Sequence, residues 1–122
     1  KKLRLPDTLS LFDESIPTIV FTAKHKESKK NLEFFTIDFS QNIIPQILAI
    51  LYELNLQSVI VEGGAMLLNS FISYGLWDEA RIFIANEKQY NWGILSPKLH
   101  NLAINESYSF NNDKLEIYYN QT

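Results

Sequence analysis

The feature that most constrains the fold is a short strand that leads through a carboxylate and two glycines into a helix. The β-branched run Gln57–Val61 is too brief for a helix and predicts a buried strand. Glu62, Gly63 and Gly64 follow it directly, and residues 65–74 have the apolar spacing of a helix. A strand joined to a helix by so short a connection is typical of α/β proteins.

The remaining segments favour the same fold class. Apolar residues recur at helical spacing around Pro45, which is tolerated in a first turn, and Ser40 and Asn42 are candidate N-caps of a helix that runs to about Asn55. Gly75 is expected to end the second helix in the left-handed conformation. Further strands are predicted at 16–23, 32–39 and 79–86, and a hairpin at 108–110 and 115–119. The expected order is β-β-α-β-α-β-loop-β-β, a mixed sheet with flanking helices.

The composition excludes several classes of site. The 122 residues suit one domain, and 46% hydrophobic with 20% charged residues is ordinary for a globular protein. Because the chain has no cysteine, it holds no disulfide, no thiolate metal ligand and no cysteine nucleophile. His25 and His100 lack the short spacing of a metal-binding pair, so no metal site is predicted.

The charge and hydropathy pattern also bears on partners and location. A formal net charge of -3 gives no general electrostatic reason to bind nucleic acid. No apolar run approaches the roughly 20 residues that span a bilayer, and the N-terminal residues lack the apolar core of a signal peptide. We therefore expect a cytoplasmic protein whose partners include neither a membrane nor a nucleic acid.

The two glycines after the predicted strand carry the clearest chemical signal. Backbone N–H groups at a helix N-terminus, together with the helix dipole, favour a phosphate, and Gly63 and Gly64 have no Cβ to block its approach. The same pair also suits a tight turn that serves packing alone, and the segment is neither a G-x-G-x-x-G fingerprint nor a P-loop. Glu62 is open to three interpretations: a surface acid, an acid placed at a helix N-terminus, or a ligand contact.

The same segment carries a family resemblance. Residues 62–79, E-G-G-A-M-L-L-N-S-F-I-S-Y-G-L-W-D-E, resemble the signature of the reductase domain of the bacterial riboflavin-biosynthesis deaminase–reductase family (RibD), which has a dihydrofolate-reductase-like fold. The matching elements, in order, are Val61–Gly64, Ser70-Phe71, Gly75-Leu76 and Asp78-Glu79, with further similarity at 3–6 and 17–22. The resemblance covers nearly the whole chain and identifies residues 1–122 as the C-terminal part of a single reductase domain.

The resemblance implies an NADPH-dependent reduction in riboflavin synthesis. The substrate would be 5-amino-6-(5-phosphoribosylamino)uracil, a phosphoribosylamino-pyrimidine whose ribose is reduced to a ribityl chain. Carried over by matching position, Glu62 would contact this substrate, and Thr22 is a weaker candidate for a cofactor contact. The cofactor diphosphate would meet the backbone N–H groups of Gly63, Gly64, Ala65, Met66 and Leu67.

The resemblance also implies a homodimer. The family edge that assists it would correspond to the aromatic hairpin near Tyr118 and Tyr119, which we interpret as a sheet edge.

Four lysines between Lys24 and Lys30 either form a solvated loop or face the 2′-phosphate of NADPH. Two alternatives stay open, a dihydrofolate-reductase-like enzyme acting on another heterocycle and a non-catalytic module for nucleotide binding or dimerisation.

This sequence departs from the family pattern in two respects. Residues 85–93 replace the A-P-x-x-x-G run that follows the strand in many members, and Gly93 would take the place of the family glycine. The family domain is also considerably longer, and its N-terminal strands, which hold much of the substrate, have no counterpart here. We therefore expect the isolated 122 residues to have weak reductase activity or none.

Overall fold

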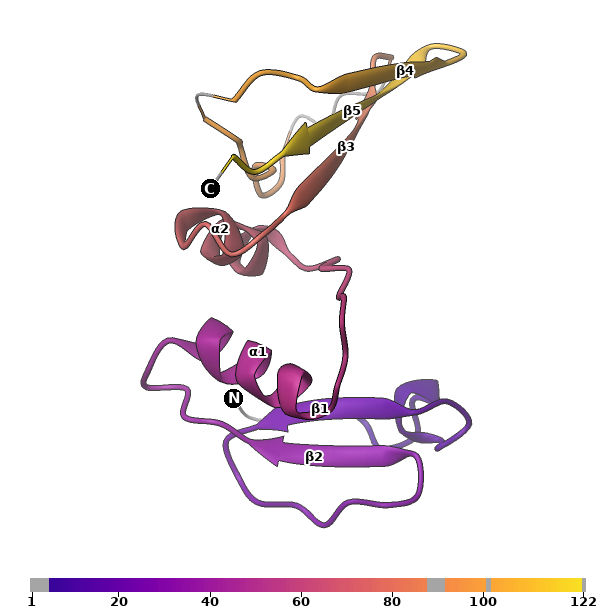
Figure 1. Cartoon of the computed structure of the whole chain (residues 1–122). Coiled ribbons are helices and arrows are strands. Elements are labelled where there is room, and N and C mark those ends of the chain that lie inside the picture. Colours follow the sequence, from indigo (N-terminus) through magenta and orange to yellow (C-terminus); the bar gives the residue numbers. More distant parts are fainter. Residues whose placement is uncertain (1–4, 88–91, 101, 122) are drawn as a thin grey trace. The chain divides into compact units, whose positions relative to one another are not determined.

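The computed structural model describes residues 5–87, 92–100 and 102–121. These residues form two compact units, Lys1–Val59 and Ile60–Thr122, which are described separately below (Figure 1). The first unit contains a parallel strand pair and a helix, and the second contains a helix and an antiparallel sheet. The α/β class is confirmed. No helix among the described residues is both long and apolar enough to cross a membrane.

In the first unit, strands β1 (Thr18–Thr22) and β2 (Leu32–Thr36) pair in parallel, with Val20 opposite Phe34. Alternate residues of a strand share one face, and the face that carries Leu32 and Phe34 is covered by Phe12 of the 3-10 turn η1 (Ser10–Phe12). Phe12, Leu32 and Phe34 are buried together, and the half-buried Val20 packs against them. Both strands lie within the predicted ranges, which are confirmed in part.

Helix α1 (Ile43–Glu53) confirms the first predicted helix. The Asn42 side chain caps it by accepting a 3.1 Å hydrogen bond from the Ile44 amide. Pro45 lies in the first turn, where its missing N–H leaves no hydrogen bond unmade. The helix ends before Asn55, which adopts a positive φ of 59°.

The prediction of a strand at Gln57–Val61 is wrong. The segment is irregular, and Val59 and Ile60 are 52% and 86% exposed. A β-strand is defined by its pairing, and among the described residues no backbone hydrogen bond joins this segment to another strand. Its β-branched composition favours a strand, but this propensity does not produce one without a second strand to pair with.

In the second unit, helix α2 (Ala65–Ser73) follows the glycine pair, and Gly75 comes just after the helix with a φ of 65°. Strand β3 (Glu79–Ala85) comes next, as predicted. The segment between α2 and β3 is hydrogen-bonded to the C-terminal residues. The Asn120 side chain donates to the carbonyl oxygens of Gly75 and Trp77 at 3.0 and 2.8 Å. The turn after α2 is thus held by a residue that follows the last strand.

Strands β4 (Glu106–Phe110) and β5 (Asp113–Tyr119) form the predicted hairpin, which turns at Asn111 with a φ of 53°. The sheet order is β3-β5-β4, with both pairings antiparallel (Figure 1). Tyr118 and Tyr119 therefore lie on the central strand, which corrects their interpretation as a sheet edge. β5 pairs with β3 on its second side, so the edge of the hairpin is β4. Between β3 and the hairpin, where the expected order places a loop, residues 88–91 and 101 lie outside the described residues.

Candidate functional site

The candidate anion site lies at the start of helix α2. Gly64 is the N-cap residue, with φ -64° and ψ 164°, and no side chain caps the helix. The Leu67 amide donates to the Gly64 carbonyl oxygen at 3.0 Å and is therefore already engaged. Among the described residues, the amides of Gly63, Gly64, Ala65 and Met66 have no backbone acceptor. Four amides at the positive end of a helix dipole can receive an anion.

The two glycines have different local roles. A Cβ atom on Gly63 would lie 2.7 Å from Cδ2 and 3.0 Å from Cβ of Leu67, so a side chain at position 63 would force Leu67 to move. A Cβ atom on Gly64 would meet no atom within 4 Å. The two interpretations of the glycine pair, a turn that serves packing and a site that receives a phosphate, therefore apply to different glycines. Packing explains Gly63, and open space beside Gly64 is what a ligand that approaches the backbone requires.

Glu62 immediately precedes this turn and is exposed to solvent. Its carboxylate forms no ion pair and no hydrogen bond with any residue that the structure describes. Because the group is not buried, it carries no desolvation cost that a partner must offset. Glu62 is thus free to contact a ligand, and its role in substrate binding stays a prediction.

A cavity that the sequence did not reveal lies at the carboxyl ends of β1 and β2. Its volume is about 490 Å³, and it is lined by Ala23, Thr36, Ile37, Asp38, Phe39 and Ser40. Ligands of open α/β sheets bind at the carboxyl ends of the strands. Thr22, the predicted cofactor contact, is buried beside this cavity without lining it, and its hydroxyl accepts a 3.4 Å hydrogen bond from the Lys24 amide.

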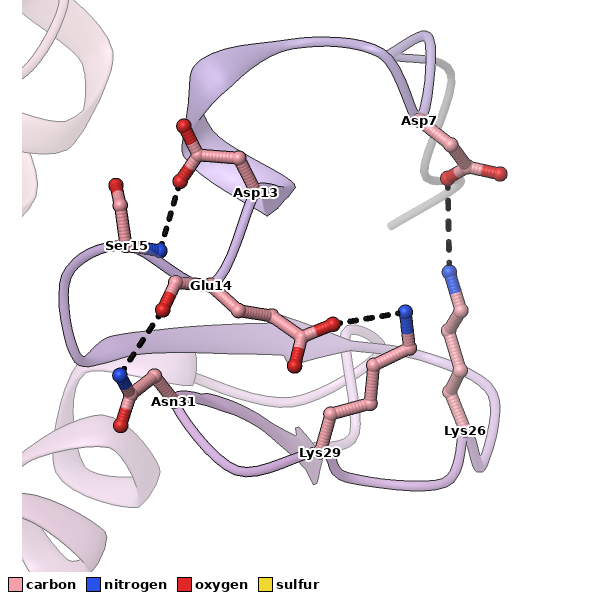
Figure 2. Close-up of polar contacts among 7 residues, drawn as sticks. All are labelled: Asp7, Asp13, Glu14, Ser15, Lys26, Lys29 and Asn31. Atoms are coloured by element: carbon pink, nitrogen blue, oxygen red, sulfur yellow. Dashed lines mark hydrogen bonds and ion pairs between the residues drawn. The ribbon is translucent and has the colours of Figure 1, made fainter.

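The lysine-rich loop is tied to the N-terminal segment of its own unit (Figure 2). Lys29 Nζ lies 3.1 Å from Glu14 Oε1, and Lys26 Nζ lies 3.7 Å from Asp7 Oδ1. Lys26 Nζ also lies 4.8 Å from the centroid of the Phe34 ring, a cation–π distance. Exposed ion pairs contribute about 0–1 kcal/mol each, so these contacts orient the loop more than they stabilise it. Two of its four lysines therefore have acidic neighbours, and contact with a 2′-phosphate stays a prediction.

The second unit contains a polar cluster on strand β5. Glu116 is buried and accepts hydrogen bonds of 2.7 Å from Lys114 Nζ and from the Tyr118 hydroxyl. These hydrogen bonds, that from Lys114 first, hold the pKa of Glu116 below its usual value. A carboxylate kept charged by two donors needs no ligand, so the cluster is structural.

Comparison with known proteins places this site in a family. A family model of the RibD C-terminal domain matches residues 1–86, which include the turn before α2. The riboflavin biosynthesis protein RibD of Bacillus amyloliquefaciens is 36% identical over 92 residues, which cover 69% of this chain and 25% of that protein. The chain spans about a quarter of the length of the curated relative it matches. By the extent of the family match, this chain belongs to the RibD C-terminal domain family.

Proposed function

We propose that this chain is the cofactor-binding part of an NADPH-dependent reductase of riboflavin biosynthesis. The substrate in this proposal is 5-amino-6-(5-phosphoribosylamino)uracil, and the enzyme works as a homodimer in the cytoplasm. The observation that carries the proposal is the start of α2, where four amides have no backbone acceptor among the described residues and Gly64 faces open space. Family membership supports the same assignment.

The residues of the turn fit a dinucleotide. The amides of Gly63–Met66 would hold the diphosphate, because a helix N-terminus stabilises negative charge without a lysine or arginine. The reduced nicotinamide would supply the hydride. Glu62 would accept hydrogen bonds from the ribose of the substrate, since its exposed carboxylate is unpaired among the described residues.

The proposed homodimer is supported by an apolar surface on the sheet of the second unit. Tyr108, Phe110 and Phe83 occur at alternate positions of β4 and β3 and are exposed. Through their pairing with β5, these side chains share one face of the sheet. Exposed aromatic residues on one face are typical of interfaces.

Replacement of Gly64 by aspartate tests where the cofactor binds. An aspartate at this N-cap position stabilises α2, but its charge would repel the diphosphate, so we expect NADPH affinity to fall at least tenfold below that of Gly64→Asn. Asparagine caps equally well without charge, which makes it the matched control. Isothermal titration calorimetry of NADPH and NADH with the folded variants measures this difference. Equal affinities for the aspartate and asparagine variants would contradict the proposal.

Replacement of Glu62 by glutamine tests the substrate contact. Glutamine keeps the size of the side chain but removes its charge, and a hydrogen bond to a charged group is worth about 1.5–3 kcal/mol. We therefore expect kcat/KM for the pyrimidine substrate to fall about tenfold or more in the full-length enzyme, with NADPH affinity unchanged. Steady-state kinetics monitored by NADPH absorbance measure both quantities. Full turnover by Glu62→Gln would remove this residue from the mechanism.

A further inference from the structure

A cavity in the unit Lys1–Val59 lies between the lysine-rich loop and the N-terminal segment. Its floor is apolar and buried, and its rim is charged. The floor is formed by Phe12, Leu32 and Phe34, and the rim by Asp7, Lys26 and Lys29. None of these residues lines the cavity at the carboxyl ends of β1 and β2. The two cavities are therefore different sites, and this one has no part in the proposed function.

The loop that carries the two rim lysines is fixed to strand β2. The backbone amide of Lys29 donates to the carbonyl oxygen of Leu32 at 2.8 Å, and the Leu32 amide donates back to Lys29 at 3.3 Å. The Phe34 amide donates to the Ser28 hydroxyl at 2.9 Å. Because the backbone on both sides of Lys29 is held in this way, the rim keeps its position over the floor without help from its ion pairs.

The two rim lysines differ in how firmly they are paired. Lys29 Nζ lies 3.1 Å from Glu14 Oε1, within hydrogen-bond distance (Figure 2). Lys26 Nζ lies 3.7 Å from Asp7 Oδ1, too far for a hydrogen bond, and the Asp7 side chain is 83% exposed, so water screens this pair. Lys26 Nζ also lies over the floor, 4.8 Å from the centroid of the Phe34 ring. Lys26 is therefore the rim cation that a ligand can engage.

Charge and size decide which ligands suit this cavity. Two lysines against one aspartate give the lining a net positive charge, which a monoanion neutralises. A carboxylate accepts charge-assisted hydrogen bonds from an ammonium group, and an attached ring would lie on the apolar floor. The cavity volume of about 230 Å³ is below the roughly 300–1,000 Å³ of sites for drug-sized ligands, so one ring suits it better than a dinucleotide.

We propose that this cavity binds a small aromatic monocarboxylate, with the carboxylate on Lys26 and the ring on the apolar floor. The floor supplies the contact that a simple inorganic anion would not use, and Lys26 supplies the charge that a neutral aromatic compound would not use. The proposal does not rest on the reductase function. All lining residues belong to the unit Lys1–Val59, whereas the start of α2 belongs to the unit Ile60–Thr122.

The test is a titration of the ¹⁵N-labelled chain with phenylacetate, followed by amide chemical shifts. We expect phenylacetate to shift the amides of Lys26, Lys29 and Phe34. Phenylacetamide has the same shape without the charge, and acetate has the charge without the ring, so each should bind about tenfold more weakly or less. Equal affinities for acetate and phenylacetate, or no shift at these three amides, would overturn the proposal.

Three variants test the role of the rim charges. Lys26→Gln should weaken phenylacetate about tenfold, because it removes the ammonium group. The matched control is Lys30→Gln, in the same loop but outside the lining, which should leave the affinity unchanged. Asp7→Asn should bind phenylacetate about twofold more tightly, since it removes a negative charge from the rim.

The gain expected of Asp7→Asn cannot come from a variant that fails to fold, so it keeps the test decisive if Lys26→Gln is unstable. Equal losses in Lys26→Gln and Lys30→Gln would reduce the binding to general attraction by the basic loop and refute the site. No gain in Asp7→Asn would refute it as well. Amide spectra that are unchanged away from the loop show that the variants fold.

Discussion

Replacement of Ile44 by alanine should lower the free energy of unfolding of the unit Lys1–Val59 by about 2–5 kcal/mol. Ile44 has 0% of its surface exposed, and it lies in the first turn of α1, where its amide also donates to the Asn42 cap. Truncation would remove buried methyl groups and leave a cavity at the point where the helix begins. Because the unit buries few side chains this completely, other buried contacts offset little of the stability lost with the Ile44 side chain.

The matched control for this prediction is Ile16→Ala in the same unit. Ile16 is 71% exposed, so the same chemical change should cost less than about 0.5 kcal/mol. Native-state hydrogen exchange of the amides in β1, β2 and α1 reports the free energy of opening of this unit directly. Similar effects of the two substitutions would show that Ile44 does not anchor the helix.

The elements that the sequence predicts well are those with local causes. Helix α1 combines a side-chain cap at Asn42, a proline in the first turn and apolar residues at helical spacing, so the signals of start, periodicity and end agree. Gly75 ends α2 for an equally local reason, because its positive φ costs a glycine little. Neither feature depends on which other segment lies nearby.

The elements that the sequence predicts poorly depend on distant partners. Gln57–Val61 has the composition of a strand, but pairing decides whether a strand forms, and no partner for it exists among the described residues. The sequence predicts a hairpin that contains Tyr118 and Tyr119, but it does not show which of the two hairpin strands pairs with a third strand. The pairing of β5 with β3, across a long connection, places both tyrosines at the centre of the sheet.

The candidate site also has one part that local sequence predicts and another that depends on contacts between distant segments. Spacing alone predicts that a glycine pair before a helix presents backbone amides, but only the position of Leu67 separates the packing role of Gly63 from the open side of Gly64. The cavity that contains Asp38 depends on two strand ends coming together, with Ala23 and Ser40 far apart in sequence. Sequence reasoning would have needed the parallel pairing of β1 and β2 to find it.

Replacement of Gly63 by alanine should destabilise the unit Ile60–Thr122 by about 1–3 kcal/mol, the cost of overpacking. The new Cβ would lie 2.7 Å from Cδ2, 3.2 Å from Cγ and 3.0 Å from Cβ of Leu67, so the first turn of α2 or the Leu67 side chain must move. Because the Leu67 amide belongs to the turn that presents the candidate anion site, NADPH affinity should fall as well. Urea denaturation followed by tryptophan fluorescence measures the change in the free energy of unfolding, since Trp77 and Trp92 both lie in this unit.

Two further variants separate a steric cause from a general intolerance of this turn. Gly64→Ala meets no atom within 4 Å and has an ordinary φ of -64°, so the stiffer unfolded chain and the poorer N-cap preference of alanine should offset each other to within about 0.5 kcal/mol. In a Leu67→Ala background, Gly63→Ala should cost less than about 1 kcal/mol, because two of the three close atoms are gone. An undiminished cost in that background would refute the contact with Leu67 and locate the requirement for glycine in the backbone itself.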